Sequence, residues 1–439
     1  MKKVFSIKKK INPFDQKISI SGDKSLSIRW VLLASQAVGK SKAHNLLMSE
    51  DVMAAVDSIK KLGIQVKITK NYCEIIGNGI NGFKYKKNLV LNAKNSGTLG
   101  RLILGLLVRS PYKIKLVGDK SLSKRDFSRI TTPLKKFGAK FYYKSKNKLP
   151  LSILGTKSPE GIKYLENKGS AQCKSSVMLA ALNASGTTSI KAKKSRDHSE
   201  LLFKYLQIPT RIKRTQKYDF IDIKQPKKIK AFDYRIPADI SSSAFFIVLT
   251  TLANNSKLLI KDVNINPSRT GVVKILKRMG AKIFFKNIRS YKGEKISDIL
   301  VISSKNLRAI NCPSTLNSSA IDECLIIFLV AARSKGVSYF KGLSELNQKE
   351  SPRLNWGAKI LNMMGVKTKL TKTSIKIYGQ PNLKIQKKII IRNYLKDHRV
   401  FMMSTVAALT CGGEWKIHDK DSINSSFPSF IKIIEKFNR

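Results

Sequence analysis

The chain has 439 residues, of which 42% are hydrophobic and 26% charged, so it is long enough for two or three domains with large cores and is not globally disordered. Its 84 Lys and Arg outnumber 28 Asp and Glu, and the resulting formal net charge of +56 indicates anionic partners. No apolar run reaches the ~18 residues of a membrane-spanning helix, and the basic N-terminus lacks the apolar core of a signal peptide. We therefore expect a cytoplasmic protein with no membrane partner.

The positive charge is spread along the whole chain. The longest run of lysines is only Lys8, Lys9 and Lys10, and there is no zinc-finger spacing or RNP-like aromatic motif. A scattered lysine surplus is typical of solvated surfaces, so we expect no nucleic-acid partner. A field that concentrates small polyanionic substrates remains open as an alternative.

The cysteines and histidines do not form a metal-binding pattern. The chain has five cysteines without a CxxC pair and four histidines without HExxH spacing. These numbers argue against a disulfide framework and against a structural zinc site.

One pattern of predicted elements recurs in chain order: an amphipathic segment with a basic end, a break, and then a β-rich run. The breaks are 69 to 85 residues apart, at Gly63, Gly138, Gln207, Gly280 and Gly365. A glycine after a helix is typical of a left-handed C′ position, and the alternating residues that follow predict a strand. Such junctions occur in many α/β proteins, but the even spacing favours an α/β fold of six structural repeats.

Two strings of eight residues are near copies of each other. GDKSLSIR ends at Arg29 and GDKSLSKR ends at Arg125. Each predicts a loop that enters a helix, where backbone N–H groups, a serine and two cations can bind an anion.

Further polar strings stand beside predicted helices. They are KNSGTLGR (94–101), GSAQCKSS (169–176), SRDHSE (195–200), IDE (321–323), QKESPR (348–353) and DHR (397–399). Together they supply many cations, some hydroxyl and amide donors, and few carboxylates, among them Asp322 and Glu350. This combination suits multiply charged anionic substrates and one or two proton transfers.

With these strings in register over the whole chain, the sequence resembles the EPSP synthase family, the 3-phosphoshikimate 1-carboxyvinyltransferases. PADISSSAFF, NPSRTG and SSFPSF complete the series. The resemblance implies a two-domain, inverse α/β barrel-like fold built from six βαβαββ repeats, three per domain. It implies one discontinuous domain of residues 1–21 plus 237–439 and a second domain of residues 22–236.

The resemblance also implies the reaction. The enolpyruvyl group of phosphoenolpyruvate is transferred to the 5-hydroxyl of shikimate 3-phosphate, through a tetrahedral intermediate, giving 5-enolpyruvylshikimate 3-phosphate and phosphate. This step belongs to the shikimate pathway, which leads to chorismate and the aromatic amino acids. It implies no metal and no organic cofactor, and we expect a monomer whose domains close on shikimate 3-phosphate.

The family's functional residues carry over by matching motifs. The resemblance implies that shikimate 3-phosphate is bound by Lys24, Ser25, Arg29, Ser170, Ala171, Gln172, Arg196, Asp322 and Lys349. It implies that phosphoenolpyruvate is bound by Lys24, Gly97, Arg125, Gln172, Arg353 and Arg399. The implied catalytic residues are Asp322, Glu350, Lys24 and Lys349. Asp322 is to accept the proton of the 5-hydroxyl, and Glu350 is to exchange a proton with C3 of the enolpyruvyl group. Which of the two carboxylates handles each proton stays open.

The chain departs from the family pattern at several positions. Asp126-Phe127 replaces Pro-Met, and we expect Asp126 to pair with Arg125 and weaken its hold on phosphoenolpyruvate. The remaining departures are Lys94 for Gly, Ile28 for His, Pro352 for Asp, and Ser425 and Ser426 where some members have Lys.

Three alternatives remain. A UDP-N-acetylglucosamine enolpyruvyl transferase would have a Lys-Asn pair and a mobile-loop cysteine, whereas this chain has Lys24-Ser25 and no cysteine between Cys73 and Cys173. The others are a catalytically inactive copy of the fold and a basic nucleic-acid-binding scaffold. Gly97 adds the expectation that glyphosate, which occupies the phosphoenolpyruvate site in the family, inhibits this enzyme.

Overall fold

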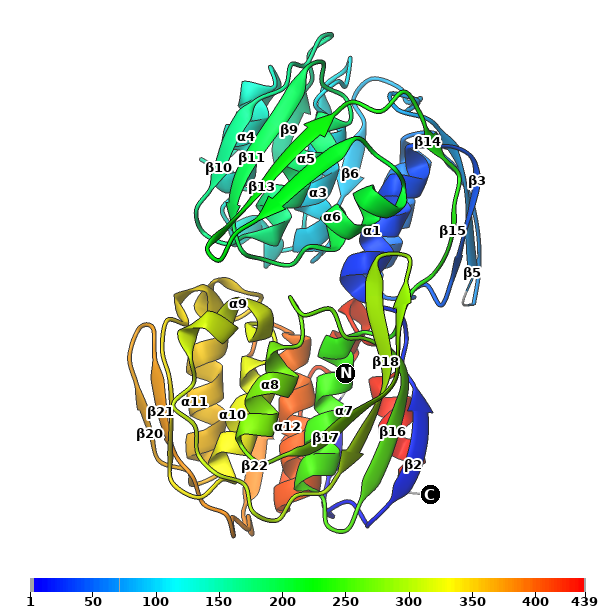
Figure 1. Ribbon diagram of the computed structural model, residues 1–439. Coiled ribbons are helices and arrows are strands. Elements are labelled where there is room, and N and C mark those ends of the chain that lie inside the picture. The colour runs from blue at the N-terminus through cyan, green and yellow to red at the C-terminus, as the bar shows by residue number, and fades with distance from the viewer. Residues whose placement is uncertain (1–3, 71, 438–439) are drawn as a thin grey trace. The chain divides into compact units, whose positions relative to one another are not determined.

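The computed structural model describes residues 4–70 and 72–437, and the chain divides into two compact units. Unit 1 comprises Met1–Ser21, Pro237–Ser290 and Lys295–Arg439, and unit 2 comprises Gly22–Ile236 and Tyr291–Glu294. Each unit mixes helices with sheets (Figure 1) and encloses its own hydrophobic core. The sequence analysis assigns residues 291–294 to the discontinuous domain, whereas the structure groups them with unit 2.

The described part of unit 2 contains three sheets. Their strand orders are β14-β3-β5-β4 with β15 beside β3, β6-β7-β9-β8, and β10-β11-β13-β12. The strands are β3 (Ala37–His44), β4 (Gln65–Thr69), β5 (Tyr72–Asn78), β6 (Val90–Asn92), β7 (Ile114–Val117), β8 (Lys140–Tyr143), β9 (Leu151–Leu154), β10 (Lys163–Glu166), β11 (Thr187–Lys193), β12 (Thr210–Arg214), β13 (Tyr218–Lys224), β14 (Ile229–Lys230) and β15 (Asp233–Arg235). The helices are α1 (Lys24–Ser35), α2 (Glu50–Lys61), α3 (Gly97–Leu106), η1 (Leu122–Lys124), α4 (Ser128–Lys136), α5 (Ala171–Ala181) and α6 (His198–Tyr205).

The described part of unit 1 also contains three sheets, with the orders β17-β18-β16-β2, β19-β21-β20 and β1-β23-β22. The strands are β1 (Phe5–Ile7), β2 (Asp15–Ser19), β16 (Lys257–Asn264), β17 (Lys282–Tyr291), β18 (Glu294–Ile302), β19 (Val337–Phe340), β20 (Thr368–Leu370), β21 (Ile375–Tyr378), β22 (Lys388–Ile391) and β23 (Glu414–Ile417). The helices are α7 (Ile240–Leu252), α8 (Gly271–Arg278), η2 (Ser314–Leu316), α9 (Asn317–Ala320), α10 (Cys324–Ala332), η3 (Ser344–Gln348), α11 (Arg353–Met363), α12 (His398–Cys411), η4 (Lys420–Ser425) and α13 (Phe430–Lys436).

Three helices of each unit are buried over most of their surface. They are α1, α3 and α5 in unit 2 and α7, α10 and α12 in unit 1. Within unit 1 these helices pack against one another, and in unit 2 α3 packs against both α1 and α5. Helix α10 is apolar all round because it has no solvent-facing side. Each of these buried helices begins at or directly after a polar string, whereas SRDHSE leads into α6 and QKESPR into α11.

Helices α3 and α5 approach each other unusually closely. A Cβ atom on Gly105 would lie 2.1 Å from the carbonyl oxygen of Ser176, so only glycine fits there. The same approach lets the Ser176 hydroxyl donate to the carbonyl oxygen of Arg101 at 2.9 Å. The close packing thereby fixes the positions of Arg101 and Gln172, which lie on these two helices.

The five predicted helix-to-strand junctions are confirmed. Each follows a helix (α2, α4, α6, α8 or α11) and precedes a strand (β4, β8, β12, β17 or β20). The backbone φ at the junction is positive in every case: +85° at Gly63, +96° at Gly138, +56° at Gln207, +95° at Gly280 and +86° at Gly365. Gln207 therefore takes the left-handed conformation that glycine adopts at the other four.

No helix in the described part of the chain is long and apolar enough to cross a membrane. All five cysteines are buried as free thiols.

Replacement of Gln207 by glycine is expected to stabilise unit 2. A side chain in the left-handed region costs about 1–2 kcal/mol, and the greater entropy of unfolded glycine offsets part of the relief, so Gln207→Gly should raise the free energy of unfolding by about 0.5–1 kcal/mol. Urea unfolding measures this change. Gln216→Gly is the control, because Gln216 is an exposed loop residue without a positive φ, and it should destabilise slightly. A decrease in stability for both variants would contradict the interpretation.

Candidate active site

The string GDKSLSIR forms the start of α1. The buried Asp23 carboxylate caps the helix by accepting a hydrogen bond from the backbone N–H of Leu26 at 2.9 Å. Lys24 begins the helix, and its Nζ lies 3.0 Å from Oδ2 of Asp51, which is on α2. The sequence analysis missed Asp51, because no local pattern links it to Lys24.

Arg29 joins three of the polar strings. Its side chain is almost buried; Nε donates to the hydroxyl of Ser199 at 2.8 Å and Nη2 to the hydroxyl of Ser175 at 2.9 Å. Its Nη1 donates to the carbonyl oxygen of Ser25 at 3.1 Å. The strings 22–29, 169–176 and 195–200 therefore meet at one guanidinium, as expected for an anion-binding site.

Gln172 lies between α5 and α3. Its amide nitrogen donates to the hydroxyl of Thr98 at 3.0 Å, and its amide oxygen accepts from Nη1 of Arg101. Ser170 caps α5 through the N–H of Cys173 at 3.3 Å, which makes Ala171 the first helical residue. The structure thus places Ser170, Ala171 and Gln172 at one helix N-terminus, where backbone N–H groups favour negative charge.

The second near copy ends in a short 3₁₀ helix, η1, and not in an α-helix. Asp119 accepts from the N–H of Leu122 at 2.7 Å, which repeats the role of Asp23. Arg125 follows η1, and its Nη2 lies 3.5 Å from the amide oxygen of Asn95. A Cβ atom on Gly97 would lie 2.9 Å from Nη1 of Arg125, so Gly97 leaves room for this guanidinium.

Two of the departures from the family pattern have local structural roles. The two carboxylate oxygens of Asp126 accept from the N–H and the hydroxyl of Ser128, both at 2.7 Å, at the start of α4. A helix start offers unsatisfied N–H groups, so this interaction replaces the expected pairing of Asp126 with Arg125. Lys94 has φ +49°, a left-handed conformation that explains why glycine is usual there.

In unit 1, three cations contact Asp322 in the turn before α10. Nζ of Lys349 is 3.1 Å and Nη1 of Arg353 is 3.6 Å from the Asp322 carboxylate. Nη1 of Arg399 donates to the backbone oxygen of Asp322 at 2.6 Å. The structure therefore brings together residues from three separate strings around one carboxylate that is 15% exposed.

Arg353 is held by a buried carboxylate. Its Nε and Nη2 donate to the two oxygens of Asp397 at 2.8 and 3.1 Å, and Nη2 also pairs with Glu350. Burial disfavours the charged guanidinium, but Asp397 and Glu350 outweigh burial and raise the pKa of Arg353. Burial likewise opposes the charge of Asp397, and Arg353 nevertheless keeps the pKa of that carboxyl below its usual value.

The Asp397 carboxylate also organises its own helix. It accepts from the N–H of Arg399 at 2.9 Å as the cap of α12, and from the hydroxyl of Ser351 at 2.8 Å. The string DHR pointed to Arg399, but the role of its aspartate was missed. Pro352 immediately precedes α11, where a proline costs no helical hydrogen bond, so that departure is compatible with the fold.

A series of buried polar contacts connects Arg399 to Asp239. Nη1 of Arg399 lies 3.5 Å from Glu323, whose carboxylate accepts from the hydroxyl of Ser241. Arg269 donates to Ser241 at 2.7 Å and pairs with Asp239 at 3.2 Å. Glu323 lies in IDE, Ser241 and Asp239 in PADISSSAFF, and Arg269 in NPSRTG. None of these four residues was predicted to have a role.

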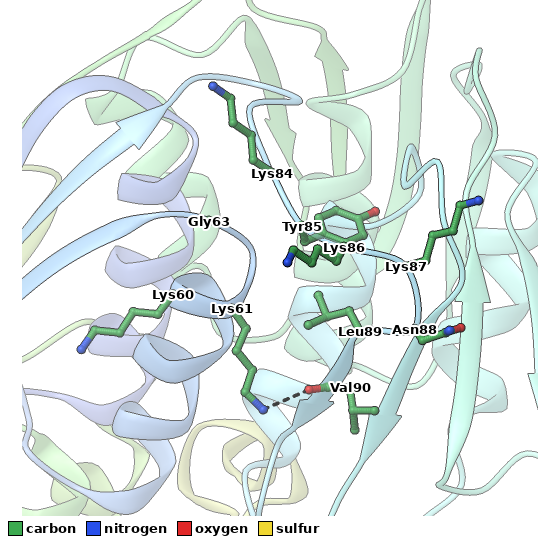
Figure 2. A pocket seen from close by; sticks show the side chains of 10 residues that line it. All are labelled: Lys60, Lys61, Gly63, Lys84, Tyr85, Lys86, Lys87, Asn88, Leu89 and Val90. Carbon is green, nitrogen blue, oxygen red and sulfur yellow. Dashed lines mark hydrogen bonds between the residues drawn. The ribbon is translucent and has the colours of Figure 1, made fainter.

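A basic cavity of about 570 Å³ lies elsewhere in unit 2, between the C-terminal end of α2 and residues 84–90. Figure 2 shows that the side chains of Lys60, Lys84 and Lys87 point in different directions, and Nζ of Lys61 donates to the carbonyl of Val90 at 3.1 Å. None of the predicted site residues lines this cavity. We do not assign it a role in catalysis.

The predicted site residues therefore form two groups, one in each unit. Unit 2 carries Lys24, Ser25, Arg29, Gly97, Arg125, Ser170, Ala171, Gln172 and Arg196, and unit 1 carries Asp322, Lys349, Glu350, Arg353 and Arg399. Arg196 stands half-buried in the loop between β11 and α6.

The ion pair of Asp397 with Arg353 predicts a pH-dependent stability. Because the pKa of Asp397 is lowered in the folded state, its contribution is present above the unfolded value of about 3.9 and is lost as pH falls through the folded value. Asp397→Asn should cost about 3–5 kcal/mol of unfolding free energy at pH 7, since it leaves Arg353 buried beside a neutral side chain. The difference from wild type should shrink at pH 3.

Urea unfolding at the two pH values measures this difference. Asp15→Asn is the control, because the exposed pair of Asp15 with Lys257 should contribute less than about 1 kcal/mol at either pH. A cost for Asp397→Asn that is the same at pH 7 and pH 3 would contradict the assignment.

Comparisons with known proteins agree over nearly the whole chain. The family model described as EPSP synthase (3-phosphoshikimate 1-carboxyvinyltransferase) matches residues 8–434. A 3-phosphoshikimate 1-carboxyvinyltransferase of Ruthia magnifica is 37% identical over 95% of this chain and 94% of its own length. One from Bacillus subtilis is 34% identical over 98% of this chain and 99% of its own length.

Solved structures give the same result. EPSP synthase from Acinetobacter baumannii superimposes with a TM-score of 0.86 at 33% identity, covering 99% of this chain and 98% of that one. The enolpyruvyl transferase NikO from Streptomyces tendae shares the fold with a TM-score of 0.76, at 12% identity over 100% of this chain and 98% of its own. With its mixed α/β architecture in two units and its full-length similarity, this chain belongs to the EPSP synthase family, the 3-phosphoshikimate 1-carboxyvinyltransferases.

Proposed function

We propose that the two groups of residues together catalyse the family's reaction, the transfer of an enolpyruvyl group from phosphoenolpyruvate to the 5-hydroxyl of shikimate 3-phosphate. The observation that carries this proposal is the convergence of Lys349, Arg353 and Arg399 on Asp322. A carboxylate among cations can accept a proton while the cations hold anionic substrates. The reaction belongs to aromatic amino-acid biosynthesis through the shikimate pathway.

The proposed mechanism has an addition step and an elimination step. Asp322 accepts the proton of the 5-hydroxyl, Lys349 beside it orients that hydroxyl, and the oxygen adds to C2 while C3 gains a proton. Phosphate then leaves C2 of the tetrahedral intermediate as C3 loses a proton. The proton at C3 is assigned to Glu350, and its ion pair with the same Arg353 that approaches Asp322 supports this assignment.

The proposed contacts of shikimate 3-phosphate come mainly from unit 2. Ser25 and Arg29 are to hold this substrate, and Ser170 and Ala171 at the N-terminus of α5 are to line its phosphate. Arg196 is to be a further basic contact. The hydroxyls of Ser175 and Ser199 keep the Arg29 guanidinium in place for this contact. Lys24 and Gln172 are to touch both substrates.

The proposed contacts of phosphoenolpyruvate are mainly arginines that already have polar partners within the protein. Arg125, Arg353 and Arg399 are to grip its carboxylate and phosphate, with the backbone of Gly97 alongside. Arginine suits this role because its planar guanidinium binds carboxylate and phosphate through two parallel hydrogen bonds.

At the level of architecture, we propose that units 1 and 2 are the family's two domains, each built from three βαβαββ repeats. The pairing of one buried helix with one more amphipathic helix supports the repeat: α1 with α2, α3 with α4, α5 with α6, α7 with α8, α10 with α11, and α12 with α13. We propose a cytoplasmic monomer whose reaction uses side chains alone.

Loss of the Asp322 carboxylate tests the mechanism directly. Wild-type protein should release phosphate only when both substrates are present, and Asp322→Ala should lower kcat by about 100-fold or more, since it removes the base. Asp421→Ala in the same unit is the control, because Asp421 forms an exposed pair with Lys396. Full activity of Asp322→Ala would overturn the assignment, and no release by folded wild type would favour an inactive copy of the fold.

An added methyl group at Gly97 tests the phosphoenolpyruvate contacts. Gly97→Ala should displace the Arg125 guanidinium, which lies 2.9 Å from the new atom. The KM for phosphoenolpyruvate should rise about tenfold, as expected for one weakened charged contact, while the KM for shikimate 3-phosphate stays near wild type.

Glyphosate extends this test. It should inhibit wild type competitively with phosphoenolpyruvate and inhibit Gly97→Ala less. Gly100→Ala, one turn further along α3, is the control because its Cβ would make only ordinary contacts, 3.4 Å or longer. Inhibition of wild type that does not compete with phosphoenolpyruvate would contradict the proposed site.

A further inference from the structure

Strands β17 and β18 are neighbours in a sheet of unit 1, yet Tyr291–Glu294, which comprise the end of β17, the turn and the start of β18, belong to unit 2. Figure 1 shows this pair of strands as a long hairpin that ends in a tight turn. The chain therefore enters unit 2 a second time, through a segment for which the sequence analysis had no signal. We call Tyr291–Glu294 the hairpin tip.

The hairpin tip has specific partners in unit 2. The Tyr291 hydroxyl accepts from the backbone N–H of Arg235 at 2.8 Å. Nζ of Lys292 lies 5.3 to 5.9 Å from the ring centroids of three tyrosines, Tyr205, Tyr234 and Tyr291. A cation among three aromatic rings holds the turn in one position through cation–π attraction.

Glu294 is the most deeply buried residue of the hairpin tip. Its Oε1 lies 2.6 Å from Nδ1 of His198, and both side chains are fully shielded from solvent. His198 is the first residue of α6, and a carboxylate there also lies near the positive end of the helix dipole. A buried polar pair of this kind is costly to break, because the partner that remains loses its hydrogen bond.

The next residue of α6, Ser199, leads directly to the proposed substrate site. The Ser199 hydroxyl accepts from Nε of Arg29 at 2.8 Å and donates to the hydroxyl of Ser175 at 2.7 Å. A shift of the first turn of α6 would therefore move one of the groups that orient the Arg29 guanidinium. These contacts connect Glu294 to Arg29 through His198 and Ser199.

We propose that Glu294 of the hairpin tip is a positioning residue for shikimate 3-phosphate binding, because its contact with His198 fixes the first turn of α6 and thereby the orientation of Arg29. This inference rests on the proposed function, in which Arg29 binds shikimate 3-phosphate. The hairpin tip lies outside all the recognised motifs, and this inference gives it a role in the affinity for shikimate 3-phosphate.

The first experiment compares Glu294→Gln with wild type by steady-state phosphate release, varying each substrate in turn. The KM for shikimate 3-phosphate should rise about tenfold, which corresponds to the coupling measured for residues in one hydrogen-bonded network, while the KM for phosphoenolpyruvate changes about twofold or less. Lys295→Gln is the matched control, because Lys295 is the exposed neighbour on the same strand. It should leave both KM values unchanged.

A double-mutant cycle separates positioning from general destabilisation. His198→Gln should have the same effect as Glu294→Gln, and the double variant should be little worse than either, since all three lack the pair of a carboxylate with an imidazole. Direct titration with shikimate 3-phosphate alone, by calorimetry, should show the same loss of affinity. Glu294→Asp retains a carboxylate on a shorter side chain, should recover part of the affinity, and serves if Glu294→Gln does not fold.

The outcomes distinguish this inference from the proposed function. If wild type binds shikimate 3-phosphate and releases phosphate, but Glu294→Gln has an unchanged KM for it, the positioning role is wrong and the proposed function stands. An equal rise in both KM values, or a fall in kcat alone, would also overturn the positioning role. If wild type neither binds shikimate 3-phosphate nor releases phosphate, the proposed function itself fails.

Discussion

The site depends on a few carboxylates that hold its cations in fixed positions. In a chain with 84 basic and 28 acidic residues, most cations have no acid to pair with, yet Lys24 lies against Asp51 and Arg353 against the fully buried Asp397. An arginine or lysine side chain that is free in solvent loses much rotamer entropy when it grips a ligand. Carboxylates that are already in place remove part of that cost for the proposed substrate contacts.

The packing of the helices brings together residues of the candidate site that are far apart in the sequence. Buried helices in each unit begin at the polar strings, and their contacts bring those strings together, as Arg29 with Ser175 and Asp322 with Arg399 demonstrate. Helices α2, α4, α6, α8 and α11 are each followed by a residue with positive φ, where the chain turns into the next strand. Gln207 also has a positive φ, so the left-handed conformation is required at this turn even where the residue is not glycine.

Much of the candidate site could be proposed from the sequence, because its residues lie in short strings whose composition suits anion binding. The strings led to Arg29, Gln172, Asp322 and Arg353, and the structure gives each of them polar partners from other strings. The carboxylates that hold the cations were mostly not predicted. Asp51 is an ordinary acid in the first turn of α2, and Glu294 stands in no motif.

Helix periodicity, turn conformation and charge are properties of short segments. The α/β class, the helix-to-strand junctions and the residue types of the candidate site could therefore be predicted before the structure was known. Which acid pairs with which cation depends on the tertiary packing. That packing also decides that residues 291–294 join unit 2, where Glu294 contacts His198 across 96 positions of sequence. Such pairings depend on how buried helices and a hairpin pack, and packing is set by contacts far apart in the chain, so no local pattern records them.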